Sequence, residues 1–338
     1  MNIREASSSR RTYSQPKSSR PVKVSSFRPV IVLMVILVLV LGWLFIGKSP
    51  LKGIGSPIKS GWSGYCLDDY LSQLSPGNHV DLWPCNGSSA QDWQVSLTGI
   101  RHNNTLCLTA SSITSITIQN CQKSPDQVWL RDGRGFLDPD RGLCLTSFGH
   151  GQGQQLSLQK CQSLTSKDQQ WTPNLNYSSY TCSGDQGQVV ACNAIKQWII
   201  WTNQPNNHES LLSAYTANDP SEEWCADFIS YVYKASGYPF TNGDYEGWDE
   251  EYAPAIIDQG FTQQTKNYVP QVGDIGYFNY PGGHVEIVVV GGQHPTFIYG
   301  NSDTIDPTTG NGQMAANDLT KDKTLGSLVY YLSPSSST

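Results

Sequence analysis

The longest apolar run of the chain covers residues 29–47, "PVIVLMVILVLVLGWLFIG", and contains no charge. A helix needs roughly 20 apolar residues to cross a bilayer, so this run predicts a transmembrane helix. The alternative is a secretory signal, whose apolar core is shorter and is followed by a small-residue cleavage site. The sequence "IGKSPLKGIGSP" that follows is a poor match to such a site. We therefore expect an uncleaved anchor.

The charges on either side of this run predict its orientation. One acid, Glu5, and seven basic residues precede it: Arg4, Arg10, Arg11, Lys17, Arg20, Lys23 and Arg28. Because cytoplasmic flanks are enriched in Lys and Arg, we expect residues 1–28 in the cytoplasm, as a disordered basic tail, and everything after residue 48 outside. Residues 48–60 then form a linker.

Residues 61–172 repeat one pattern of short alternating segments three times. Each copy has a Cys-Leu pair, a strand-like segment that ends on a second cysteine, and a Gln-x-Trp triplet. The triplets end at Trp93, Trp129 and Trp171. A period of this size indicates one supersecondary unit repeated around a shared core, so the region is predicted to be an all-β domain.

Eight of the nine cysteines are expected to form four pairs, each between consecutive cysteines of the chain. Three pairs fall within the repeats: Cys66–Cys85, Cys107–Cys121 and Cys144–Cys161. A fourth, Cys182–Cys192, is expected to close a small hairpin or loop within a linker over 173–194. Disulfides persist outside the cytoplasm, and closing loops of this size contributes about 3 kcal/mol each in the chain-entropy model. The odd cysteine, Cys225, is an intermolecular partner, an inert buried thiol or a nucleophile.

Cys225 lies in a segment with apolar residues at helical spacing, "NDPSEEWCADFISYVYKASG". We expect a helix that starts near Asp219 or Ser221 and ends at Gly237, with Cys225 in its first turn. Backbone N–H groups and the helix dipole would stabilise a thiolate there. Glu222 and Glu223 act against this, so a nearby imidazolium would be needed.

Of the three histidines in this part of the chain, His284 is the candidate base. It follows two glycines and begins a strand that becomes continuously apolar, whereas His208 and His294 lie in polar segments and are expected in solvent. A hairpin centred near residue 293 places Asn301 opposite His284 or within one or two positions of it. An amide oxygen there would fix the tautomer of the imidazole. Glu286, on the same face of the strand as His284, is a competing orienter.

The net charge of −6 argues against nucleic acid as a partner. His, Asp and Glu show no metal-ligand spacing, so we expect no metal and no cofactor.

The repeats resemble the ricin-type lectin domain, a β-trefoil of three Gln-x-Trp units. The resemblance implies a sugar site in the first repeat, which keeps Asp68 two residues after Cys66. Trp83 would stack on a pyranose, and Asp81 and Gln91 would complete its hydrogen bonds. The site departs from the family at Ala90, where binding repeats carry Asn. The second and third repeats have Thr and Gln instead of the Asp and the ring, and are expected to be structural.

The segments "WCADFISYVY", "VGDIGYF", "GGHVEIVVV" and "IYGNSD" resemble, in this order, the CHAP family of cysteine, histidine-dependent amidohydrolases/peptidases. The resemblance covers residues 195–333 and implies an α+β, papain-like fold related to the NlpC/P60 group. It assigns Cys225 as nucleophile, His284 as base and then acid, and Asn301 as orienter. Many members have Glu two residues before that Asn, where this chain has Tyr299, which leaves the third residue open.

The sequence thus predicts a multidomain protein at the cell membrane, with its N-terminus in the cytoplasm and both folded domains outside. We expect an amidase or endopeptidase that cleaves peptidoglycan and is held to wall glycan by the trefoil. A non-catalytic surface adhesin with a degenerate C-terminal domain is the alternative. An acyl or peptide transferase that uses the same pair is a third possibility.

Overall fold

The computed structural model describes residues 55–162, 166–173, 180–217, 219, 223–240, 256–257, 259–280, 283–317 and 327–334. The apolar segment 29–47 lies outside these residues, so the anchor stays a prediction. No helix within the described ranges is long and apolar enough to cross a membrane.

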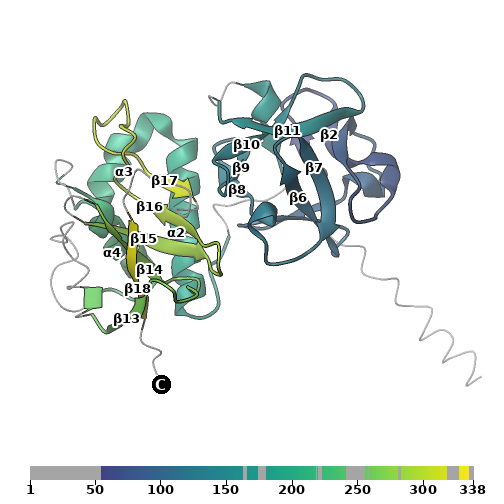
Figure 1. The fold of residues 1–338 in the computed structure, drawn as a ribbon. Coiled ribbons are helices and arrows are strands. Elements are labelled where there is room, and N and C mark those ends of the chain that lie inside the picture. Colours follow the sequence, from purple (N-terminus) through teal and green to yellow (C-terminus); the bar gives the residue numbers. More distant parts are fainter. Residues whose placement is uncertain are drawn as a thin grey trace, which may run out of the picture. The chain divides into compact units, whose positions relative to one another are not determined.

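The first domain is built from short antiparallel strands (Figure 1). They are β1 (Lys59–Ser60), β2 (Tyr65–Asp69), β3 (Val80–Pro84), β4 (Trp93–Val95), β5 (Ile100–His102), β6 (Leu106–Ser112), β7 (Ser115–Asn120), β8 (Leu130–Asp132), β9 (Gly135–Asp138), β10 (Leu143–Ser147), β11 (Gln154–Lys160) and β12 (Trp171–Thr172). One sheet has the order β12-β1-β2-β3-β11-β10-β9-β8, and a second has the order β4-β5-β6-β7.

The three hairpins β2–β3, β6–β7 and β10–β11 are joined to one another by backbone hydrogen bonds in a closed ring. The backbone N–H of Gly77 donates to Ile118 O at 2.8 Å, Leu158 N–H to Ile113 O at 2.7 Å, and Gly153 N–H to Leu82 O at 2.8 Å. Each bond joins a hairpin loop to a strand of another repeat. This ring is the three-fold arrangement that a β-trefoil requires.

The Gln-x-Trp triplets hold the three repeats in the same way. Each tryptophan is buried and its Nε1 donates at 2.9 Å to the carbonyl that follows the first cysteine of its repeat, at Leu67, Leu108 or Leu145. The glutamines are buried as well, and their amides bond to the loop after the second cysteine. The predicted structural role of the tryptophans is therefore confirmed.

All four predicted disulfides are present, and Cys225 is the free, buried cysteine. The segment between Cys182 and Cys192, however, is not a hairpin or loop. Helix α2 (Gln186–Asn203) runs through it and past the expected boundary at residue 195. Asp185 accepts from Gln188 N–H at 2.9 Å, while the Gln188 side chain accepts from Asp185 N–H at 3.2 Å. This reciprocal cap starts the helix and so places Cys192 within it.

The second domain is α+β, as predicted. Its helices are α2, α3 (His208–Tyr215) and α4 (Cys225–Ala235). Its strands are β13 (Phe261–Thr265), β14 (Ile275–Asn279), β15 (His284–Val290), β16 (Thr296–Tyr299), β17 (Ala315–Asn317) and β18 (Ser327–Pro334). The sheet order is β13-β18-β14-β15-β16-β17, and every pairing is antiparallel.

One face of this sheet packs against the helices. Alternate residues of the central strand β15, namely Val285, Ile287 and Val289, share a buried core with apolar residues of α2 and α4. His284 and Glu286 alternate with them along β15. The strand thus carries buried apolar side chains on one face and two buried titratable side chains on the other.

Candidate functional site

Cys225 is the first residue of α4, and Trp224 is the N-cap residue before it. The Cys225 side chain is only 1% exposed. The backbone N–H groups of Val285 and Ala226 lie close enough to its sulfur to lower the pKa of the thiol. Cys225 and Val285 also share one buried core, so the start of α4 lies against β15, one residue after His284.

The thiol does not have the low pKa that its helical position predicts. Burial, together with the charges of Glu223 and Asp227, raises the pKa of Cys225 to about 12, although the two backbone N–H groups lower it. Charge on sulfur is unfavourable where water is excluded, and the dipole of one helix does not offset that cost. The helix start alone therefore does not favour a thiolate at Cys225 in this structure, and Glu223 acts against it, as expected.

His284 lies beside Glu286. Its Nε2 is 3.4 Å from Glu286 Oε1, and both side chains are almost fully buried. The ring also meets Tyr299 edge-on, with centroids 5.0 Å apart. Burial lowers the pKa of His284 to about 3, so the imidazole is neutral at physiological pH. Within the described residues no hydrogen bond joins Cys225 to His284.

The expected hairpin register is confirmed, but not the expected partner of His284. Ile287 pairs with Ile298, and continuing that register brings residue 284 opposite Asn301. The Asn301 amide instead donates to the Glu223 carboxylate, and its backbone has a positive φ of 58°. Of the two candidate orienters, the structure brings Glu286 to His284. Glu222 lies outside the described residues.

His208 is the histidine that sequence reasoning missed. It begins α3 and is 6% exposed, so the expectation that it lies in solvent is wrong. Its Nδ1 lies 2.6 Å from Asp306 Oδ2. The polar residues around it, "QPNNHES", gave no signal of burial, because the aspartate is 98 residues further along the chain. His294 is exposed, as predicted.

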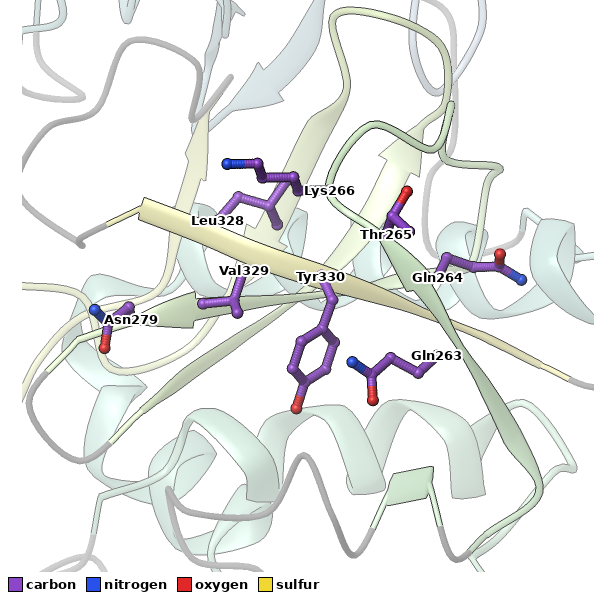
Figure 2. Close-up of a pocket in the computed structure, with 8 residues that line it drawn as sticks. All are labelled: Gln263, Gln264, Thr265, Lys266, Asn279, Leu328, Val329 and Tyr330. Carbon is purple, nitrogen blue, oxygen red and sulfur yellow. The ribbon is translucent and has the colours of Figure 1, made fainter.

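A surface groove of about 660 Å³ lies over β13, β14 and β18 (Figure 2). Its lining residues are Gln263, Gln264, Thr265, Lys266, Asn279, Leu328, Val329 and Tyr330, none of which is a cysteine, histidine or carboxylate. Tyr330 pairs with Tyr277 across the sheet, and Tyr277 pairs with Val285. Residues paired across antiparallel strands share a face, so the groove begins about 10 Å from the backbone that contacts Cys225.

The predicted sugar-site residues gather on the hairpin β2–β3. Asp68 pairs with Asp81, and Trp83, two residues further along β3, is partly exposed. Gln91 is 1% exposed, and its Nε2 donates to Asp68 Oδ2 at 2.8 Å and to Pro84 O at 3.0 Å. Gln91 therefore positions Asp68 and is not itself open to a ligand.

Asp81 distinguishes the first repeat from the other two. Both its carboxylate oxygens are buried without a hydrogen-bond partner. Burial, and then the charges of Asp68 and Asp69, raise the pKa of Asp81 to about 7. The positions equivalent to the Asp68–Asp81 pair are hydroxyls, Thr109 with Thr117 and Thr146 with Ser157. Only the first repeat carries an acidic pair on its hairpin. This difference agrees with a binding role for the first repeat and structural roles for the other two.

One group of possible metal ligands occurs in the described part of the chain, formed by Asp132, Cys144 and Cys161. The two sulfurs are joined in a disulfide, so they offer no thiolate to a cation.

Two family models match the chain. The model of the ricin-type beta-trefoil lectin domain matches residues 56–171, and that of the CHAP domain matches residues 216–301. Two separate parts of the chain are thus similar to known domain families. The first similarity agrees with carbohydrate binding, and the second with an amidase or peptidase activity in general. The CHAP match includes Cys225, His284, Glu286 and Asn301.

Proteins similar to part of the chain were also found. An agglutinin of Ricinus communis is 27% identical over 151 residues, which are 41% of this chain and 26% of the agglutinin. A ribosome-inactivating protein of Sambucus nigra, SNAIf, is 33% identical over 116 residues, or 33% of this chain and 20% of that protein. The chain thus spans about a quarter or less of these relatives. The C-half of an earthworm R-type lectin in complex with GalNAc is 20% identical, with a TM-score of 0.31 over 35% of this chain and 95% of that one.

Proposed function

We propose that the protein is a membrane-anchored, extracytoplasmic peptidoglycan hydrolase that cleaves an amide bond of the wall with Cys225 and His284. The bond is either the N-acetylmuramoyl–L-alanine amide or a peptide bond of the stem or cross-bridge. The observation that carries the proposal is the packing of Cys225 against Val285 in one buried core, where the Val285 N–H also lowers the pKa of the thiol. It joins the thiol to the strand on which His284 and Glu286 flank Val285.

The proposed chemistry starts from neutral groups. Cys225 Sγ attacks the amide carbonyl carbon while its proton passes to His284. Nε2 of His284 faces Glu286, which leaves Nδ1 for this proton. The oxyanion accepts hydrogen bonds from backbone N–H groups at the start of α4, including that of Cys225 itself. His284 then protonates the leaving amine, and it takes a proton from the water that hydrolyses the thioester.

Glu286 is the proposed third member of the site. A carboxylate beside Nε2 fixes the ring orientation and stabilises the imidazolium that forms during attack. The register Ile287–Ile298 puts Glu286 opposite Tyr299, the position at which the family resemblance expects Glu. The carboxylate thus reaches the same place from the neighbouring strand.

The trefoil is proposed to hold the enzyme to wall glycan through its first repeat. Sugar hydroxyls donate hydrogen bonds, and the carboxylate oxygens of Asp81 lack a donor; because Asp81 is fully buried, a sugar would reach them only after a local movement of the hairpin β2–β3. Trp83 provides a partly exposed ring for the apolar face of a pyranose. Even a weak glycan site raises the local concentration of a tethered hydrolase at its substrate.

The test is digestion of purified peptidoglycan by residues 49–338, with mass analysis of the products. Wild-type protein should release fragments with new amine or carboxyl ends, and Cys225→Ala should release none. Equal release by the variant would refute the enzyme.

A non-catalytic glycan-binding adhesin is the second candidate. The deep burial of both Cys225 and His284 favours it, because neither side chain is open to substrate in this structure. The adhesin predicts wall binding that requires Trp83, together with no fragment release at any enzyme concentration.

A further inference from the structure

A buried His–Asp pair joins helix α3 to the loop between β16 and β17 in the C-terminal domain. His208, at the start of α3, lies 2.6 Å from Asp306, in the loop between β16 and β17. Their side chains are 8% and 3% exposed. Both residues lie outside the segment that the CHAP model matches.

The contacts of this pair fit two opposite charges. Although burial alone would raise it, the pKa of Asp306 lies below its ordinary value, because the N–H groups of Thr309 and Thr308 and the His208 ring donate to it. The second ring nitrogen of His208, Nε2, lies 2.9 Å from the Trp201 carbonyl oxygen. Carboxylate and carbonyl are both acceptors, and only an imidazolium donates to both. The ring also stacks on Trp201, with centroids 3.8 Å apart, which favours a cation further.

Asp306 lies at the far end of a self-bonded hairpin, residues 300–313. Ser302 N–H donates to Gln313 O at 2.9 Å, and Asp306 N–H donates to Asn311 O at 2.7 Å. Residues at the base of this 300–313 hairpin form hydrogen bonds with the two residues just before the nucleophile. Trp224 Nε1 donates to Gly312 O at 3.1 Å, and the Asn301 amide donates to Glu223.

A second route leads from His208 to the same place. Trp201, on which His208 stacks, lies on α2, and its ring is 5.6 Å from that of Trp224. Trp224 is fully buried and immediately precedes Cys225. The pair therefore acts on Trp224 from two sides, through Trp201 and through the 300–313 hairpin.

We propose that His208 and Asp306 are positioning residues that fix the 300–313 hairpin and Trp224, and through them the Cys225 end of α4, for catalysis. This inference rests on the proposed function of Cys225. Misplacing a nucleophile by about 1 Å costs up to about 100-fold in rate, so the pair should act on kcat and leave substrate binding alone.

The experiment compares full-length wild type with Asp306→Asn, His208→Gln and the double variant. The substrate is muropeptides released from purified peptidoglycan by a muramidase. Each single variant should lower kcat by about 10-fold to 100-fold with KM within about twofold. The double variant should be no worse than the single ones, because the two residues act as one unit. Asp306→Glu, which restores the charge, should recover part of the lost kcat.

The matched control is His102→Gln in the trefoil. His102 Nε2 lies 3.4 Å from Asp69 Oδ2, and both side chains are fully buried, so this pair is similar in kind but remote in sequence from the hydrolase site. The control should keep the wild-type kcat. A folded Asp306→Asn or His208→Gln with wild-type kcat, a change in KM alone, or an equal kcat loss in the control would each overturn the inference.

A second readout separates this inference from the proposed function. The rate at which iodoacetamide alkylates Cys225 should rise in Asp306→Asn and in His208→Gln, because a released α4 terminus exposes the thiol. If wild type cleaves nothing, the proposed function fails, and the alkylation rates alone decide the positioning role. Unchanged rates in both variants would refute it.

Discussion

Gly300→Ala tests how tightly the residue before the nucleophile is held. Gly300 lies against the indole of Trp224, and a Cβ atom there would be 2.3 Å from both Cε3 and Cζ3. Ordinary contacts begin near 3.4 Å, so the ring would have to move by about 1 Å. Trp224 has little room to move, because it is fully buried, stacks on Tyr215 with centroids 5.8 Å apart, and donates to Gly312 O.

The cost follows from these contacts. Overpacking of a filled core costs about 1–3 kcal/mol, and loss of the bond to Gly312 adds about 1 kcal/mol. Replacing Gly by Ala recovers about 0.4–1 kcal/mol through the unfolded chain. The free energy of unfolding of the C-terminal domain should therefore fall by about 2 kcal/mol, which lowers its melting temperature by about 4–8 °C.

Denaturant unfolding followed by circular dichroism measures this change, and kcat on muropeptides measures its effect on Cys225. Gly99→Ala is the control, since its Cβ would come no closer than 3.4 Å to another atom, Gln127 O. That variant should be nearly neutral. An unchanged unfolding midpoint together with unchanged kcat in Gly300→Ala would refute the packing argument.

Three further predictions concern titratable groups. Native Cys225 should react with iodoacetamide far more slowly than the unfolded chain, because burial raises the pKa of its thiol to about 12. Its alkylation rate, followed by peptide mass spectrometry, should show no inflection between about pH 5 and about pH 8. An inflection near neutrality would contradict this. Glu286→Gln should lower kcat by about 100-fold and Asn301→Ala by much less, because Glu286 is the group beside His284; the reverse order would make Asn301 the orienter. For Asp81, burial and then its acidic neighbours raise the pKa to about 7. The folded trefoil then keeps a proton that the unfolded chain releases above about pH 4, so its stability falls as the pH rises from about 4 to about 7. Asp81→Asn should remove that fall, on the order of 4 kcal/mol in denaturant titrations, and an unchanged pH dependence would argue against a protonated Asp81.

Local rules predicted much of the first domain. The three disulfides within the repeats and the buried Gln-x-Trp tryptophans follow from a repeat that places the same side chains in the same surroundings three times. The role of Gln91 was not predictable in this way. Only the structure shows that its amide is used by the protein, on Asp68 and Pro84, as the amides of its counterparts are.

The C-terminal domain was predicted less completely, because its site depends on contacts between distant segments. The hairpin register was correct, yet Asn301 turns to Glu223, a residue 78 positions away. Burial, which no local sequence pattern around Cys225 shows, has the largest effect on the pKa of its thiol and outweighs the helix terminus. The start of α2 could be predicted from the sequence, because Asp185 and Gln188 have the Asp-x-x-Gln spacing of a capping box. The short spacing of Cys182 and Cys192 suggested a closed loop there instead.

The most direct test of the account is digestion of purified peptidoglycan by the protein and by its Cys225→Ala and His284→Ala variants, with mass analysis of the soluble products. We expect fragments with new amine or carboxyl ends from the wild type and none from either variant. Equal release of fragments by the three proteins would contradict it.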